Sequence, residues 1–169
     1  MVRLRAELTA RLRNLAVLEL ANTVWIGWVV FVTFDAPMSA ANAIGYGLAA
    51  AHLITGAMYW AAKLRQLGAG LPRPPLIGVF RWLRPVCAVG LAAGLVVIAA
   101  ALASGRGGID VVPGAVLYGL AAAEYVNYFQ WQLMHDTCAD WRRLLRTRRL
   151  HRSHLYEDIR VHRKPQAAR

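Results

Sequence analysis

Residues 85–104 read PVCAVGLAAGLVVIAAALAS, and no side chain among them is charged. About 20 apolar residues in a helix reach across the hydrocarbon core of a bilayer, so this stretch predicts a membrane-spanning helix. Three further stretches of this kind run over about 15–34, 41–60 and 111–133. We therefore predict an all-α fold, an integral membrane four-helix bundle that occupies residues 15–135.

Basic residues are confined to the segments between and beyond these stretches. All but Arg106 of the 20 Lys and Arg residues lie in residues 1–14, in the connection from Lys63 to Arg84, or in the tail 136–169. Because Lys and Arg accumulate in cytoplasmic loops, both termini and the central connection are predicted to face the cytoplasm. The expected location is the plasma (cytoplasmic) membrane, which the chain crosses in several passes.

The formal net charge of +11 has the same explanation. A strongly basic chain can instead bind nucleic acid, but here the charges alternate with membrane-length apolar stretches, and we expect no nucleic-acid partner. The two cysteines, Cys87 and Cys138, form no CxxC pair and fall on the predicted cytoplasmic side, where thiols stay reduced. We expect neither a redox site nor a zinc site.

The basic tail has two interpretations. Its apolar residues lie among arginines, and the segment contains Trp141, Leu144, Leu145 and Leu150 with Arg142, Arg143, Arg146, Arg148 and Arg149. This composition suits a helix that lies on an anionic leaflet, which makes anionic lipid headgroups the expected partners of the basic cytoplasmic face. The alternative is a basic cytoplasmic helix that only fixes the topology.

Gly90 and Gly94 lie four residues apart on one face of the third stretch. This spacing lets two helix backbones approach closely. It indicates a packing surface, either within the bundle or between protomers. We expect a homo-oligomer or a larger membrane complex.

The fourth stretch carries the polar residues that suggest a site. At helical spacing, Glu124, Asn127, Tyr128, Trp131 and His135 share one face. Glu124 lies close to the midpoint of the predicted span. A charged residue at the bilayer centre costs about 2.5–3.5 kcal/mol on insertion scales, so such residues normally face the protein interior and mark a functional site.

Partners for Glu124 come from the first two stretches. Span one contributes Glu19 and Asn22, and span two contributes His52. With a rise of about 1.5 Å per residue, Glu19 lies roughly 9 Å on the cytoplasmic side of the midplane, and His52 lies just inside the midplane. We expect these residues to converge with Glu124 and Asn127 in the cytoplasmic half of the bundle.

We assign catalytic or transport roles to Glu124, Glu19 and His52 in this predicted site. We assign substrate binding to Asn22, Asn127, Tyr128 and Trp131. The alternative is that these side chains only hold helices together, through interhelical hydrogen bonds that contribute about 0.6 kcal/mol on average.

The histidines do not predict a cofactor. His52 and His135 would lie at different depths, so they are poorly placed to ligate one haem iron. The tail histidines, His151, His154 and His162, lie among arginines whose field disfavours a metal cation. We expect no metal site, and the sequence identifies no other cofactor.

Three functions remain open. The favoured one is a small polytopic membrane protein that works as an oligomer or subunit and transports protons, ions or a small solute through the Glu/His/Asn site. The second is a membrane enzyme that acts on a lipid or isoprenoid, with Glu124 and Glu19 as acid and base. The third is a structural accessory or assembly subunit of a membrane complex.

Overall fold

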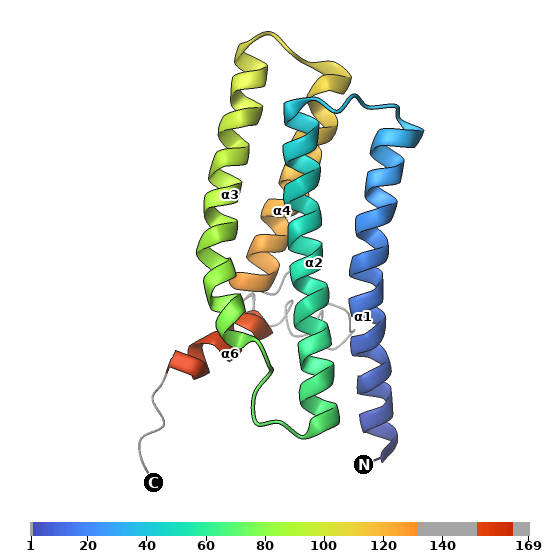
Figure 1. Cartoon of the computed structure of the whole chain (residues 1–169), viewed down its shortest axis with the longest axis vertical. Coiled ribbons are helices and arrows are strands. Elements are labelled where there is room, and N and C mark those ends of the chain that lie inside the picture. Colours follow the sequence, from blue (N-terminus) through green and yellow to red (C-terminus); the bar gives the residue numbers. More distant parts are fainter. Residues whose placement is uncertain (1, 132–151, 164–169) are drawn as a thin grey trace, which may run out of the picture.

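The computed structural model describes residues 2–131 and 152–163, and every regular element in them is helical (Figure 1), which confirms the all-α prediction. The elements in chain order are α1 (Val2–Trp28), the π-helical turn η1 (Val29–Thr33), α2 (Ala40–Ala69), α3 (Ile77–Ala103), the 3-10 turn η2 (Gly108–Asp110), α4 (Val112–Phe129) and α6 (His154–Arg163).

Helices α1 to α4 run up and down side by side, and α2 is the central one, because it packs against α1, α3 and α4 (Figure 1). The start of α1, the connection between α2 and α3, and α6 all lie at one end of the bundle. We call this the basic end, because it contains the Lys63–Arg84 connection. The connection between α1 and α2 and the turn η2 lie at the opposite end.

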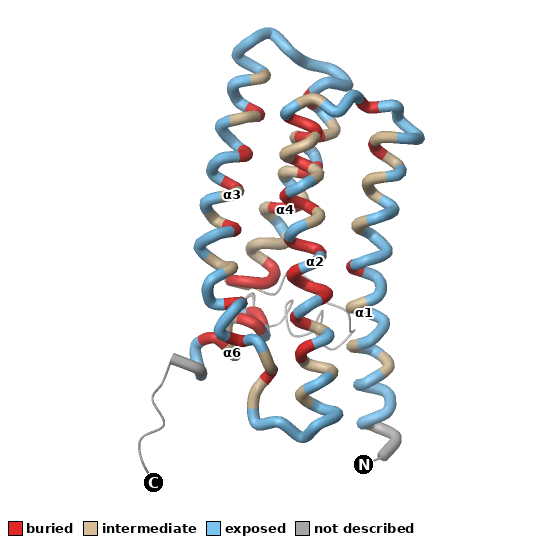
Figure 2. The backbone as a smooth tube through the Cα atoms, viewed as in Figure 1, coloured by how far each residue is buried: buried red, intermediate tan, exposed pale blue. Residues whose placement is uncertain are grey.

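Three helical segments are long and apolar enough to cross a bilayer, namely Arg5–Thr33, Ile77–Ala103 and Gly108–Phe129. They coincide with the first, third and fourth predicted spans. Most residues of the first two segments are exposed (Figure 2), and Val24 and Val96 are 72% and 67% exposed. The third segment is more buried but exposes Val112 and Val116. An apolar surface of this extent is typical of helices that face lipid or another protein.

Helix α2 is not one of these three, although it has 30 residues. Its apolar content is reduced by Asn42, His52 and Thr55, all of which are buried. The central position of α2 explains this pattern, because its polar side chains contact other helices. The prediction that 41–60 spans the membrane stays a prediction.

Two helices extend farther toward the basic end than the predicted spans do. Helix α1 starts at Val2, so the basic segment and the first apolar stretch form one continuous helix. Helix α3 starts at Ile77 and contains Pro85. A proline within a helix loses its own hydrogen bond, here to the carbonyl of Arg81, and its ring crowds that carbonyl. Helix α3 nevertheless continues through Pro85.

Close backbone contacts join α2 to its neighbours. A Cβ atom on Gly45 would lie 2.2 Å from the carbonyl oxygen of Gly114, so α2 and α4 touch through their backbones. A Cβ atom on Gly94 would lie 2.5 Å from the side chain of Leu48. The predicted GxxxG surface of α3 is thus used within the bundle, against α2.

Asn42 fastens the opposite end of the bundle. Its Oδ1 atom accepts a hydrogen bond from the backbone N–H of Gly114 at 2.8 Å. Its Nδ2 atom donates to the carbonyl oxygens of Pro37 and Ile109, both at 2.9 Å. One fully buried amide therefore ties α2 to both connections at this end and to the start of α4.

Candidate functional site

A buried carboxyl–phenol contact joins α1 to α4. Glu19 and Tyr128 are 8% and 3% exposed, and the Tyr128 hydroxyl donates a hydrogen bond to Oε1 of Glu19. Tyr128 lies against Gly56 of α2, where a Cβ atom would be 2.2 Å from the phenol oxygen. The missing side chain at Gly56 therefore makes room for the phenol that bonds Glu19.

Glu124 is a second carboxylate, one helical turn before Tyr128. It is half-buried and accepts a hydrogen bond from Nδ2 of Asn127 at 3.4 Å. It lies one turn from Tyr128 on the same face of α4, and Tyr128 bonds Glu19, so the two carboxylates belong to one group of side chains. We call Glu19, Glu124, Asn127 and Tyr128 the carboxylate cluster.

The hydroxyl of Tyr128 donates its single hydrogen to Glu19. Glu19 and Glu124 retain further lone pairs that can bind a proton or a small cation. Two carboxylates of one group in apolar surroundings repel each other, and a bound proton or cation relieves that repulsion.

His52 lies beside this cluster and not within it. Its Nδ1 atom is 2.8 Å from the carbonyl oxygen of Leu48, and a carbonyl only accepts, so Nδ1 carries the hydrogen. Its ring meets the Tyr125 ring edge to face, with centroids 6.1 Å apart. Among the described residues, no hydrogen bond joins His52 to Glu124, and its buried Nε2 atom has no partner.

Two further predicted site residues lie outside the cluster. Asn22 is exposed, because the stripe of α1 that packs inward passes through Glu19 and Thr23, one turn apart, and Asn22 lies to one side of it. Trp131 is half-buried at the basic end, where the Arg152 guanidinium lies 3.9 Å from its ring centroid. Among residues 2–131 and 152–163, no hydrogen bond joins either of them to Glu19 or Glu124.

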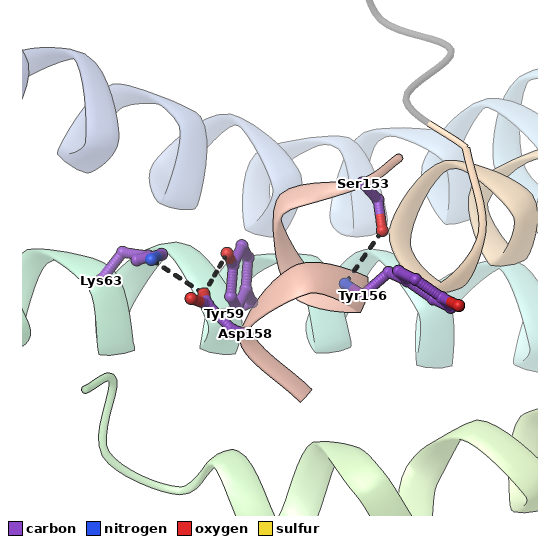
Figure 3. A network of polar contacts seen from close by, with 5 residues as sticks. All are labelled: Tyr59, Lys63, Ser153, Tyr156 and Asp158. Atoms are coloured by element: carbon purple, nitrogen blue, oxygen red, sulfur yellow. Dashed lines mark hydrogen bonds and ion pairs between the residues drawn. The ribbon is translucent and has the colours of Figure 1, made fainter. Parts of the chain in front are cut away.

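The sequence predicted a tail helix around Trp141 to Leu150, whereas the helix that the structure describes in the tail is α6, and α6 closes the basic end. Asp158 accepts a hydrogen bond from the Tyr59 hydroxyl at 2.8 Å and pairs with Nζ of Lys63 at 2.8 Å (Figure 3). Leu155 and Ile159, four residues apart, are buried in the cluster of apolar side chains at this end. This i, i+4 pair of apolar residues is the sequence pattern that could have revealed the helix.

Ser153, just before α6, links that helix to the carboxylate cluster. Its hydroxyl accepts a hydrogen bond from the backbone N–H of Tyr156 at 3.1 Å, as a helix cap does (Figure 3). It also donates to the backbone carbonyl of Tyr128 at 2.5 Å. The position of the Tyr128 backbone is therefore braced by α6.

Several predictions concern residues outside the described ranges. They are the positions of His135, Cys138, Trp141 and His151, and the proposed tail helix around Leu144. The side chain of His162 is likewise not described. Within residues 2–131 and 152–163, no three His, Cys, Asp or Glu side chains come together in an arrangement that could hold a metal ion.

Comparisons of the chain with protein-family models, curated proteins and solved structures found no match.

Proposed function

We propose that the chain is a multi-pass protein of the plasma membrane, with four spans and both termini in the cytoplasm. The exposed apolar surfaces of α1, α3 and α4 support this location. The central position of α2 supports a fourth span, because neighbouring helices accommodate its polar side chains. The basic connection, the start of α1 and α6 share one end, which supports a cytoplasmic basic end.

The proposed activity is transport of protons or small cations through the carboxylate cluster. The observation that carries it is the buried Glu19, held by Tyr128, with Glu124 one turn from Tyr128 on the same face of α4. An ionisable group inside a span costs roughly 2.5–3.5 kcal/mol, so a second one beside it favours a functional role over simple packing. Tyr128 is next to the last residue of α4, so the cluster would load from the basic end.

A flux measurement tests this activity. The purified protein is placed in liposomes that enclose a pH-sensitive dye, and a potassium gradient with valinomycin sets the membrane potential. We expect proton flux in the wild type and flux at the level of protein-free liposomes for Glu19→Gln and Glu124→Gln. The matched control is Glu7→Gln, at an exposed acidic position of α1, which should keep wild-type flux.

Three results would reject the transport proposal. They are no flux of H⁺, Na⁺ or K⁺ in the wild type, undiminished flux in Glu124→Gln, and an equal loss in Glu7→Gln.

The proposal includes a homo-oligomer, because four helices in one chain enclose little room for a path. Chemical cross-linking in the liposomes should therefore trap dimers or larger species.

Labelling of single cysteines tests the topology. In a chain without Cys87 and Cys138, a cysteine at Ser39 should react with a membrane-impermeant maleimide added to intact cells. A cysteine at Arg65, an exposed residue at the basic end, should react only after lysis. The opposite pattern would contradict the proposed orientation.

A further inference from the structure

A cavity of about 460 Å³ lies at the basic end, between α3, α4 and α6. Its walls combine guanidinium groups, aromatic rings and aliphatic side chains, and they contain no acidic residue; the lining residues are Arg81, Trp82, Arg84, Pro85, Tyr125, Tyr156, Ile159 and Arg160. Three positive charges in one cavity without a carboxylate favour an anionic ligand.

One arginine of this cavity lies over an aromatic ring of the lining. The Arg84 guanidinium is 5.7 Å from the ring centroid of Tyr156, and Arg152, which is not a lining residue, is 4.8 Å from the same centroid. In the described part of the chain, neither Arg81, Arg84 nor Arg160 forms an ion pair with an acidic side chain. A guanidinium that stacks on a ring keeps its in-plane N–H groups available for an oxyanion.

The orientation of α6 separates its charges. Asp158 is turned toward α2, where Lys63 and Tyr59 bind it, whereas Arg160 lines the cavity. Two residues so spaced point to nearly opposite sides of a helix. Of the two acids of α6, Asp158 is thus neutralised on the side of α2, and Glu157 is exposed and is not a lining residue. The positive charge remains in the cavity.

The outer flank of the cavity is apolar. Trp82 and Val86 of α3, one helical turn apart, are 73% and 62% exposed; Trp82 lines the cavity, and Val86 follows the lining residue Pro85. Tryptophan favours the level of lipid headgroups, and the apolar surface beyond it suits an acyl chain. A soluble phosphate would contact only the arginines, whereas a phospholipid would contact the arginines with its phosphate and the apolar flank with its acyl chains.

We propose that the cavity binds the phosphate of an anionic phospholipid, with its acyl chains against the Trp82 flank of α3. The bound oxyanion would receive bidentate hydrogen bonds from the arginines. The headgroup would also connect α3 to α6 and so hold α6 over the basic end. This inference rests on the proposed membrane location and not on transport, so lipid binding and proton flux can fail separately.

Native mass spectrometry of the full chain in a non-ionic detergent tests the inference. The probes are dioctanoyl phosphatidylglycerol, dioctanoyl phosphatidylcholine and inorganic phosphate, each titrated separately. We expect one phosphatidylglycerol per chain, at an affinity about 10-fold or more above that for phosphatidylcholine. Arg84→Gln combined with Arg160→Gln should weaken phosphatidylglycerol binding by about 10-fold or more. The control Arg65→Gln removes one charge at the same end but outside the cavity, and it should change binding less than about 2-fold.

Each other outcome overturns the inference. Equal weakening by Arg65→Gln would mean general attraction to a basic surface. Equal binding of phosphatidylcholine would exclude recognition of the net charge, and inorganic phosphate that binds as tightly as phosphatidylglycerol would make the ligand a free anion. If the double variant loses its thermal transition, Arg81→Gln at an exposed lining position replaces it, and unchanged lipid affinity in that variant would overturn the inference.

Discussion

Tyr128 of α4 bonds Glu19 of α1 while its phenol oxygen lies where a side chain at position 56 of α2 would be. Three helices therefore meet at one hydrogen bond. Helix α1 makes its other contacts mostly with α2, so this bond is a direct polar link between α1 and α4. The predictions below follow from this contact and from the two ends of the bundle.

Gly56→Ala should displace Tyr128. The added Cβ atom would lie 2.2 Å from the phenol oxygen, so either the ring or α2 must move. We expect the free energy of unfolding to fall by about 1–3 kcal/mol, as it does for overpacked cores. Unfolding in mixed micelles measures it. The control is Gly47→Ala on the same helix, where nothing lies within 4 Å of the new atom; an equal loss there would contradict the steric explanation.

Tyr128→Phe should leave the buried Glu19 without its donor. Removing one partner of a buried hydrogen bond costs about 1–3 kcal/mol. In a double-mutant cycle with Glu19→Gln, the two losses should not add, and the coupling free energy should be about 0.5–3 kcal/mol. Tyr118→Phe, at a half-buried position of the same helix, is the control. Additive losses would mean that the two side chains act independently.

Asn42→Ala should loosen the opposite end of the bundle. The change removes three hydrogen bonds. It leaves the buried N–H of Gly114 without its acceptor, and the Ile109 carbonyl loses its bond from Asn42, whereas the Pro37 carbonyl keeps its bond from Ser39. We expect a loss of about 2–4 kcal/mol in the free energy of unfolding. Asn22→Ala, at an exposed position, should stay within about 0.5 kcal/mol of the wild type. A loss of similar size for Asn22→Ala would contradict its exposed position on α1.

Leu155→Ala should release α6 from the basic end. Leu155 is 1% exposed, and truncating a buried leucine costs about 2–5 kcal/mol. Hydrogen exchange should therefore accelerate in α6 and at the start of α3, and less so at the centre of α2. Val161→Ala, at a position 55% exposed on the same helix, should leave exchange unchanged. Uniform acceleration through all helices would argue against α6 as a separately docked element.

The helical architecture could be predicted because it depends on local properties. The length of an apolar run determines whether a helix can span a bilayer, and three of the four predicted runs meet this criterion. The spacing of Glu124, Asn127 and Tyr128 was likewise sufficient to place them on one face of α4. The rise of about 1.5 Å per residue along each predicted span also predicted that Glu19 lies at the same depth as this group.

The remaining features depend on rotation about each helix axis and on distant contacts. Depth alone does not determine which neighbour a side chain faces, so His52 was expected beside Glu124 but meets Tyr125. Asn22 lies off the narrow inward stripe of α1 for the same reason. Helix α6 is short and highly charged, and its place depends on Tyr59 and Lys63, which lie far away in the sequence.

Helix α6 is also the last described element to be synthesised, so it docks after α1 to α4 have formed. Since a chain is made from its N-terminus, the ribosome produces α1 to α4 before it produces α6. Until then, Tyr59 and Phe80 lack the cover that Leu155 and Ile159 give them, and the Tyr128 carbonyl lacks its bond from Ser153. In the proposed topology, the helices would therefore enter the bilayer first, and a segment folding in the cytosol would complete their inner end afterwards.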